Sequence, residues 1–109
     1  MSHLPKFWHV YLVRCRDDSL YCGIAVSVSR RIVQHNSGAG AKYIVPSRRP
    51  VKCVWKRKAR DHGDALRLEY WLKHGGAAVK RDLAEGRITL RRGRDGMWQT
   101  VRRGSLKRP

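Results

Sequence analysis

Hydrophobic and polar positions alternate in the first part of the chain. Between residues 7 and 15 the side chains fall on two sides, with Trp8, Val10 and Leu12 on one and His9, Tyr11 and Val13 on the other. A period of two is typical of a half-buried β-strand. Residues 16–19 are turn formers, and residues 20–24 supply a second apolar stretch. The pattern predicts an antiparallel hairpin.

The two tyrosines of this hairpin, Tyr11 and Tyr21, are predicted to share one of its faces. Successive side chains of a strand point to opposite faces, so the register decides whether the two can meet. A shared face requires an odd number of loop residues, or a bulge, around residues 16–19. A tight two-residue turn at Asp17-Asp18 would separate them.

A helix is predicted to follow the hairpin, over residues 28–36. Ser27 or Ser29 suits its N-cap, and Gly38 ends it. Residues 38–50 are rich in glycine, proline and basic residues, which indicates a loop.

Two more helices are predicted in the second half of the chain. The longer one begins at Asp61, with Asp64 as a further capping residue, and ends near Gly75-Gly76, where glycine suits a left-handed cap. A shorter helix covers residues 77–85 and ends at Gly86.

Further strands are predicted on either side of these helices. Residues 51–58 form the third strand, with one face made of Val51, Cys53 and Trp55. Residues 88–90 and 97–101 flank Asp95-Gly96, a hairpin turn signal. The predicted fold is α/β (α+β): a small central antiparallel or mixed three-stranded sheet flanked by helices, with a C-terminal β-hairpin extension. Residues 102–109 are predicted to form a mobile basic tail.

The charge of the chain narrows the class of partner. Its 109 residues include 25 Lys and Arg against 8 Asp and Glu, a formal net charge of +17. Such a field attracts polyanions, and nucleic acid is the commonest of them. A ribosome-bound protein or one acting at a membrane surface would show the same excess, so charge alone does not identify a chemistry.

Cysteine usage and hydropathy favour a cytoplasmic protein. The 3 cysteines are Cys15, Cys22 and Cys53, without any C-x-x-C spacing, which disfavours a zinc site or a disulfide framework. No apolar run approaches the roughly 20 residues of a membrane span. Residues 1–6 lack the apolar core of a signal peptide.

Several residues could carry chemistry. Tyr11 and Tyr21 are ordinary strand aromatics unless a cation or metal activates a phenol. Arg31 and His35 are four positions apart and therefore share a helix face, where they could form a solvated basic surface or hold a phosphate.

Glu69 is the most informative carboxylate, because it falls within the apolar stripe of the longer helix. Buried there, it needs a partner. An intrahelical ion pair with Lys73 would satisfy it and would stabilise the helix by about 0.3–0.5 kcal/mol. The other interpretation is a ligand for Mg²⁺ or Mn²⁺, completed by waters and a substrate phosphate.

The order and spacing of these residues resemble the GIY-YIG nuclease superfamily, especially its small stand-alone bacterial members. The half-motifs are His9-Val10-Tyr11 and Tyr21-Cys22-Gly23, followed by Arg31, His35, the segment 38–43 and Glu69. The resemblance implies that Tyr11 is the general base, that Tyr21 assists, that Arg31 and His35 are catalytic, and that Glu69 binds one divalent metal. Residues expected to bind nucleic acid are Arg30, Lys42, Tyr43 and Lys73.

The chain also departs from the family pattern. His9 replaces the glycine of the first half-motif, and Cys22 replaces the isoleucine of the second. Many members carry an asparagine well after the glutamate, whereas the only asparagine here is Asn36. Segment 38–43 could admit a phosphate through its amides and Lys42, or could be a plain connector.

The favoured function is a Mg²⁺- or Mn²⁺-dependent endonuclease acting on nucleic acid, DNA rather than RNA, with a role in DNA repair. Without an appended reading domain, its target choice would come from nucleic-acid structure or a protein partner. Residues 1–86 would form the GIY-YIG-like nuclease domain, and residues 87–109 the hairpin and basic tail. The alternatives are a non-catalytic nucleic-acid-binding module that retains the fold and a ribosome-associated basic protein.

Overall fold

A three-stranded antiparallel sheet, in the order β2–β1–β3, forms the centre of the molecule. The structure, a computed structural model, describes residues 7–103. Strand β1 (His9–Arg14) lies between β2 (Leu20–Ala25) and β3 (Lys52–Lys58). The sheet is entirely antiparallel, which confirms the predicted α/β class and leaves no mixed pairing.

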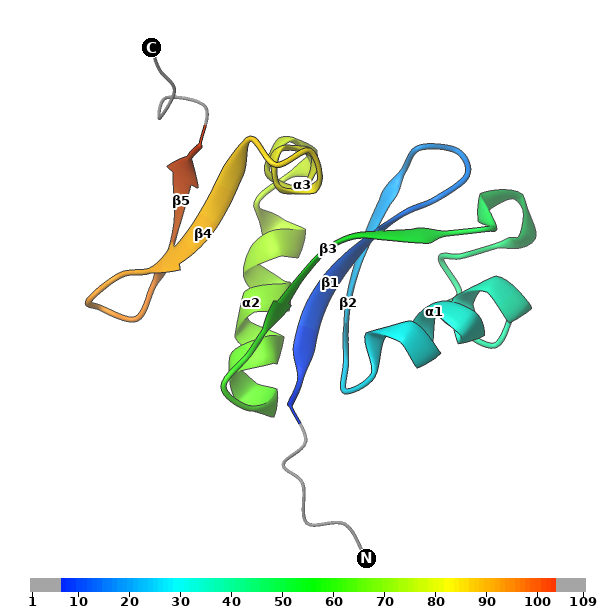
Figure 1. Cartoon of the computed structure of the whole chain (residues 1–109), viewed down its shortest axis with the longest axis horizontal. Helices are drawn as coiled ribbons and strands as arrows, with labels where there is room; N and C mark the ends of the chain where they lie inside the picture. Colours follow the sequence, from blue (N-terminus) through cyan, green and yellow to red (C-terminus); the bar gives the residue numbers. More distant parts are fainter. Residues whose placement is uncertain (1–6, 104–109) are drawn as a thin grey trace, which may run out of the picture.

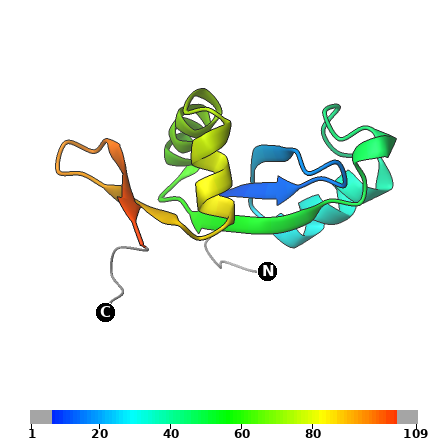
Figure 2. The same cartoon turned by 90° about the horizontal axis from the view of Figure 1, so that it is seen from above.

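Helices cover both faces of this sheet (Figures 1 and 2). Helix α1 (Val28–Ser37) packs on one face, and α2 (His62–His74) and α3 (Ala77–Ala84) pack on the other. A short 3₁₀ turn, Pro46–Arg48, lies in the connection between α1 and β3. No helix within residues 7–103 is long and apolar enough to cross a membrane.

The register of the β1–β2 hairpin brings the two tyrosines to one face. Tyr11 is paired with Gly23, and Val13 with Tyr21. Arg14 pairs with Leu20, so residues 15–19 form a connection with an odd number of residues. The prediction of a shared face is confirmed.

The prediction for β3 was wrong at one position. Trp55 lies opposite Leu12, whereas Cys53 lies opposite Val13, because the register shifts between Leu12 and Val13. Leu12 and Val13 point to opposite faces, so the irregularity sends Trp55 to the α2 side and leaves Cys53 on the α1 side. A strict period of two cannot anticipate an inserted residue.

The helix ends follow the capping chemistry of the sequence. Ser27 accepts a hydrogen bond from the Arg30 amide at the start of α1, and Gly38 ends α1 with a φ of 92°. Asp61 caps α2 through the Asp64 amide. The glycine pair after α2 differs from the prediction: Gly75 has an ordinary φ of −80°, and Gly76, which precedes α3, takes the left-handed φ of 89°.

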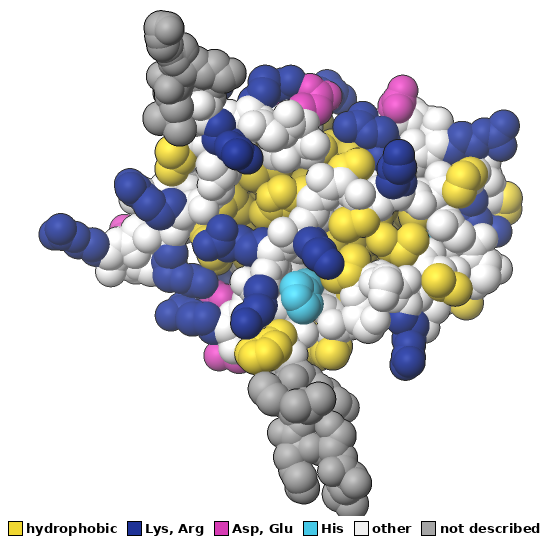
Figure 3. Space-filling model, viewed as in Figure 1, with side chains coloured by type: hydrophobic (Ala, Val, Ile, Leu, Met, Phe, Trp, Pro, Cys, Tyr) yellow, Lys and Arg dark blue, Asp and Glu magenta, His cyan; other side chains and the backbone are white. Residues whose placement is uncertain are grey.

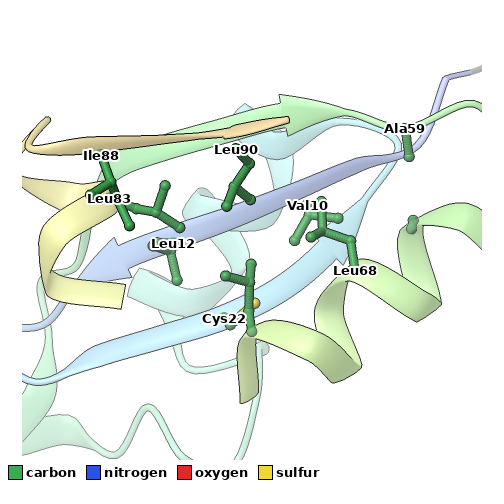
Figure 4. Packing of buried hydrophobic residues seen from close by; sticks show 10 residues of the cluster. Val10, Leu12, Cys22, Ala59, Leu68, Leu83, Ile88 and Leu90 are labelled. Carbon is green, nitrogen blue, oxygen red and sulfur yellow. The ribbon is translucent and has the colours of Figure 1, made fainter. Parts of the chain in front are cut away.

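Two apolar clusters hold the layers together. The larger one, on the α2 side, joins the sheet to α2, α3 and β4 (Ile88–Arg92); its members include Val10, Leu12, Cys22, Leu68, Leu83 and Leu90 (Figure 4). The smaller one joins the other face to α1 and contains Tyr11, Val13, Val28 and Ile44. The Asn36 side chain fastens the end of α1 to the sheet, since it exchanges two hydrogen bonds with the Val51 backbone.

A second, two-stranded sheet is formed by β4 (Ile88–Arg92) and β5 (Trp98–Arg102). Strand β4 is two residues longer than predicted, β5 is shifted by one residue from the predicted range, and the two are joined through the predicted Asp95-Gly96 turn, where Gly96 has a φ of 81°. The tail prediction was wrong for Arg102, the last residue of β5, and for Arg103, whose backbone amide donates to the Arg87 carbonyl at 2.9 Å. Residues 1–6 and 104–109, which carry the signal-peptide argument and the rest of the predicted tail, lie outside the described residues.

Candidate active site

A buried hydrogen bond between Tyr11 and His35 lies at the centre of the site. The Tyr11 hydroxyl is 2.8 Å from Nε2 of His35, and both side chains are almost fully buried, with 1% and 0% of their surface exposed. Strand β1 directs Tyr11 toward α1, and His35 comes from the last turn of α1. The contact therefore joins the sheet to the helix that covers it.

The hydrogen bond of the other ring nitrogen, Nδ1, determines which nitrogen of His35 carries the proton. Nδ1 accepts a hydrogen bond from the Ala41 backbone N–H at 3.2 Å. A backbone amide can only donate, so in the neutral ring Nε2 carries the proton and donates it to the Tyr11 oxygen. Burial, followed by the charge of Arg31, lowers the pKa of His35, which favours this neutral form.

Tyr11 is a neutral phenol in this environment. Burial raises its pKa to about 12, Tyr21 adds to that effect, and the neighbouring Arg31 guanidinium opposes it. Since His35 donates to the phenolic oxygen, the proton of Tyr11 remains available for another acceptor. No such acceptor for it lies within hydrogen-bond distance in residues 7–103.

Arg31 lies beside these two groups with an orientation set by its own helix. Its Nη1 donates to Oε1 of Gln34 at 2.8 Å. Arg31 and Gln34 line an open cavity of about 390 Å³ together with Arg30 and the residues between β2 and α1. Two guanidinium groups at one cavity suit an anion such as a phosphate.

Tyr21 connects this group to the edge of the sheet, because β2 is an outer strand. Its ring meets the His35 ring edge-on at 5.5 Å and stacks on Tyr43 at 5.6 Å. Arg48 lies over the Tyr43 ring at 4.1 Å. Burial raises the pKa of Tyr21, with Lys73 opposing and Glu69 adding to the shift.

Glu69 approaches the same edge from the other face of the sheet, on α2. Its Oε2 lies 3.3 Å from Nζ of Lys73, and its side chain is 19% exposed. The Lys73 ammonium lies 5.9 Å from the centre of the Tyr21 ring. Burial and then the Glu69 charge raise the pKa of Cys22 to about 12. The Glu69 carboxylate thus lies near both Tyr21 and Cys22, the first two residues of the second half-motif.

Glu69 could hold a divalent metal as a single protein ligand, with the rest of the coordination supplied by waters and substrate. No cluster of three or more His, Cys, Asp or Glu side chains able to hold a metal occurs in the part of the chain that the structure describes. Glu69 is partly accessible, and Lys73 is paired with one of its two oxygens. Magnesium commonly keeps several waters and takes one carboxylate plus substrate phosphates, so this single carboxylate fits such an ion.

The predicted site residues fall into a connected group and two outliers. Tyr11, Tyr21, Arg31 and His35 lie together; Glu69, Lys73 and Tyr43 adjoin them through Tyr21. Arg30 is exposed and shares the cavity of Arg31. Lys42 is exposed and makes no hydrogen bond or ion pair with any other residue between 7 and 103.

Sequence reasoning missed three contributors to the site. Gln34 orients Arg31, the Ala41 amide fixes the His35 tautomer, and Arg48 covers Tyr43. The spacing of three between Arg31 and Gln34 on a helix was visible in the sequence. The other two depend on the path of the loop after α1, for which the sequence carries no comparable signal.

Comparisons with known proteins identify the family of the chain. The family model described as the GIY-YIG catalytic domain matches residues 7–81. A UPF0213 protein of Vibrio cholerae is 42% identical over 87 residues, which cover 79% of this chain and 85% of that protein. A UPF0213 protein of Desulfotalea psychrophila is 44% identical over 79 residues, or 72% of this chain and 71% of its own.

A solved structure is also similar. The solution NMR structure of the UPF0213 protein BH0048 from Bacillus halodurans is 37% identical, with a TM-score of 0.47, and the match covers 72% of this chain and 83% of that one. The family model spans more than half of the chain and includes the two tyrosines, Arg31, His35 and Glu69. The chain therefore belongs to the GIY-YIG family and, with it, to a nuclease superfamily.

Proposed function

We propose that this protein is a divalent-metal-dependent endonuclease that hydrolyses phosphodiester bonds in DNA. The observation that carries the proposal is that Tyr21 lies between two sets of groups: Tyr11, His35 and Arg31 on the α1 side of the sheet, and Glu69 with Lys73 on the α2 side. A base, a donor to that base, a guanidinium and a carboxylate are the groups that phosphodiester hydrolysis needs.

Tyr11 is the proposed acceptor of the proton of the attacking water. At a pKa of about 12 it must first be deprotonated, and the two groups beside it favour that change. His35 donates a hydrogen bond to the phenolic oxygen, and Arg31 places a positive charge next to it. Both interactions are stronger with a phenolate than with a phenol, so His35 acts as a positioning donor and not as the base.

Arg31 is the proposed ligand of the scissile phosphate. Its contact with Gln34 uses Nη1, which leaves other guanidinium donors free to face the cavity. Negative charge grows on the phosphate oxygens during attack, and a donor held in place by Gln34 stabilises that charge without reorganising. Arg30 on the rim of the same cavity, with Lys42, Tyr43 and Lys73 outside it, is proposed to hold neighbouring parts of the nucleic acid.

Glu69 is the residue that would hold the Mg²⁺ or Mn²⁺ ion. The ion supplies positive charge that neutralises a phosphate oxygen and lowers the pKa of groups beside it. To bind the ion, Glu69 must be released from its ion pair with Lys73 or be shared with it. The Lys73 ammonium, which lies near the Tyr21 ring, can then contact that ring or a phosphate. Tyr21 is the proposed assistant, since it contacts His35 on one side and the Glu69–Lys73 pair on the other.

Target selection is proposed to depend on nucleic-acid structure or on a partner protein. The chain has a high positive charge, which favours any phosphate backbone and carries no sequence information. Branched or single-stranded DNA, as arises during DNA repair, is the favoured substrate. The proposed compartment is the cytoplasm, because the three cysteines are unpaired.

A cleavage assay with matched variants tests the proposal. Purified protein is incubated with duplex, flap, junction, single-stranded DNA and RNA, with Mg²⁺, Mn²⁺ or a chelator. We expect metal-dependent cleavage of at least one DNA substrate, lost in Glu69→Gln and Tyr11→Phe and kept in the control Glu85→Gln. Glu85 is exposed and is paired with Arg87, away from the site. DNA binding without cleavage in every condition would reject the enzyme.

Such an outcome would support a second candidate, a nucleic-acid-binding module without activity. Two observations favour it: Tyr11 is 1% exposed with a raised pKa, and Lys73 already neutralises Glu69. In that case Glu69→Gln would leave both the binding and the response to metal unchanged.

A further inference from the structure

The β4–β5 hairpin is an addition to the family domain that is held in a fixed position. The family model ends at residue 81, before the hairpin begins. Ile88 and Leu90 are buried in the larger apolar cluster. Arg92 binds the buried carboxylate of Asp64 through two hydrogen bonds of 2.9 and 3.0 Å. These contacts attach the hairpin to the start of α2.

Aromatic contacts reinforce this attachment. The Trp98 ring of β5 lies under two guanidinium groups, Arg92 at 4.3 Å and Arg57 at 4.8 Å from its centre. Arg57, from β3, also donates to the Leu90 carbonyl at 3.1 Å. Strand β3, helix α2 and both hairpin strands are therefore linked by one network, so the hairpin projects from the domain as a rigid arm.

The hairpin carries exposed arginines with no acidic partner within residues 7–103, and they lie on both of its faces, since Arg102 is opposite Ile88 whereas Arg91 is opposite Gln99. Four exposed arginines belong to it: Arg91, Arg94, Arg102 and Arg103. None of them forms an ion pair with a residue between 7 and 103, in contrast to Arg87 and Arg92, which are paired with carboxylates. The single acidic residue of the hairpin, Asp95, accepts the Met97 amide within the turn. Lys and Arg side chains gather on this end of the molecule (Figure 3).

The tip of the hairpin is hollowed between these side chains. An open cavity of about 650 Å³ is lined by Arg91, Arg92, Gly93, Arg94, Asp95 and Gln99. Arg91 donates one hydrogen bond to Gln99 Oε1 at 3.1 Å, which orients its guanidinium and leaves the Gln99 amide donors available. Oriented guanidinium and amide donors around a hollow suit phosphate oxygens.

We infer that the β4–β5 hairpin is a second nucleic-acid-binding surface, which contacts the phosphate backbone of duplex DNA away from the cleaved position. The inference rests on the proposed nuclease function for the identity of the polymer. The hairpin and α1 lie at opposite ends of the molecule in both views (Figures 1 and 2). A rigid arm at that distance engages only a duplex long enough to span both surfaces.

The size of the molecule sets the length of that duplex. The longest dimension is 43 Å. At 3.4 Å per base pair, that is about 13 base pairs of B-form DNA. The proposed division of the chain follows from this: residues up to 86 cleave, and the hairpin positions the duplex arm of the substrate.

Binding measurements with duplexes of two lengths, without metal, test the inference. The double variant Arg91→Ala/Arg94→Ala is compared with wild type on duplexes of about 8 and about 24 base pairs, below and above the expected span. We expect the variant to lose about tenfold in affinity on the long duplex and much less on the short one. The magnitude of its log–log salt slope on the long duplex should fall by about 1.8, or 0.9 for each lost phosphate contact.

Two controls separate position from charge. Lys52→Ala/Lys56→Ala removes two exposed cations from β3 and should change binding to the two lengths equally. Arg91→Lys/Arg94→Lys keeps the charge and should restore most of the salt slope. Unfolding curves of all variants should overlay, since the substituted side chains are exposed.

The outcomes distinguish this inference from the proposed function. If wild type binds and cleaves DNA but the hairpin variant keeps the wild-type length dependence and salt slope, the inference is wrong and the nuclease stands. A hairpin effect seen only with duplex RNA would overturn the assignment to DNA. Absence of any nucleic-acid binding by wild type would overturn both.

Discussion

Gly23 lies directly across the β1–β2 ladder from Tyr11, and the Tyr11 ring occupies the space that a side chain on Gly23 would need. A Cβ atom at Gly23 would lie 2.5 Å from the Tyr11 hydroxyl oxygen and 2.7 Å from the ring carbon that bears it. The glycine of the second half-motif is thus required by the position of the tyrosine of the first.

Gly23→Ala should therefore displace Tyr11 from His35. We expect the single-turnover cleavage rate to fall at least about 100-fold, because the misplaced group is the proposed base. DNA affinity should change little. The rate is measured at saturating enzyme, and the Tyr11–His35 contact is followed by the NMR shifts of the His35 ring.

Gly63→Ala is the matched control for this substitution. Its added methyl group would come closest to the flexible end of Arg67, at 3.2 Å, and would make an ordinary contact with Oδ1 of Asp61 at 3.5 Å, while alanine is favoured in a helix. This variant should keep full activity. A Gly23→Ala protein as active as Gly63→Ala would show that Tyr11 does not have to remain in its present position.

The contact between Arg31 and Gln34 predicts a graded effect on the rate. Arg31→Ala removes the donor to the phosphate and should lower the single-turnover rate by about 10²- to 10³-fold. Gln34→Ala leaves the guanidinium but removes the bond that orients it, so a smaller loss of about tenfold is expected. Rates and DNA dissociation constants are measured for both variants.

Arg30→Ala serves as the control, since Arg30 is exposed on the rim of the same cavity. It should weaken binding and its salt dependence without changing the saturated rate. Equal rate losses for the Arg30 and Arg31 variants would argue that the cavity contributes charge alone and that no single guanidinium faces the reacting phosphate.

The burial of neutral His35 predicts a pH dependence of stability. Its pKa is lowered by burial and by Arg31, so the unfolded chain binds a proton at a higher pH than the folded protein does. This contribution to stability is fully present above the unfolded pKa of about 6.5 and is lost as the pH falls through the folded pKa, by at most about 1.4 kcal/mol per pH unit. Protonation also forces Nδ1 to face the Ala41 N–H as a second donor.

Denaturant unfolding between about pH 7.5 and pH 5 measures this dependence. His35→Gln removes the titrating group and should flatten that part of the profile. His74→Gln, an exposed position, should leave the wild-type profile unchanged. If the His35→Gln profile retains the full acid slope, His35 does not cause it.

The sequence was sufficient for the parts of the fold that depend on local chemistry. Ser27, Asp61 and Gly38 act at the helix ends where their side chains or backbone preferences predict. The shared face of Tyr11 and Tyr21 followed from counting residues between two strands. These features involve neighbours in the chain, so a single sequence carries their signal.

Features that depend on distant segments were not predictable in this way. The irregularity that sends Cys53 and Trp55 to opposite faces is set by pairing with β1, which lies 40 residues earlier. Asp64 was interpreted as a capping residue, and it does accept the Arg60 amide, but its main partner is Arg92 in the hairpin. No periodicity connects these two residues.

Asp64 and Arg92 provide the last prediction, which concerns stability. Burial alone would raise the pKa of Asp64, but the bonds from Arg92 and from the Arg60 backbone outweigh it and hold that pKa below its usual value. Asp64→Asn keeps the size of the side chain but leaves the Arg92 charge without its partner, so we expect a loss of about 3 kcal/mol in the free energy of unfolding. The ion-pair contribution in wild type is present above the unfolded carboxyl pKa of about 3.9 and is lost as the pH falls through the folded pKa, so the difference between the two proteins should shrink in acid. The hairpin amides should exchange faster with solvent in Asp64→Asn, while the amides of β1 and β2 are affected less.

Asp82→Asn, which weakens a more exposed pair with Arg87, is the control and should cost less than about 1 kcal/mol. Equal stabilities for the Asp64 and Asp82 variants, with unchanged hairpin exchange, would show that the hairpin is held by its apolar contacts alone.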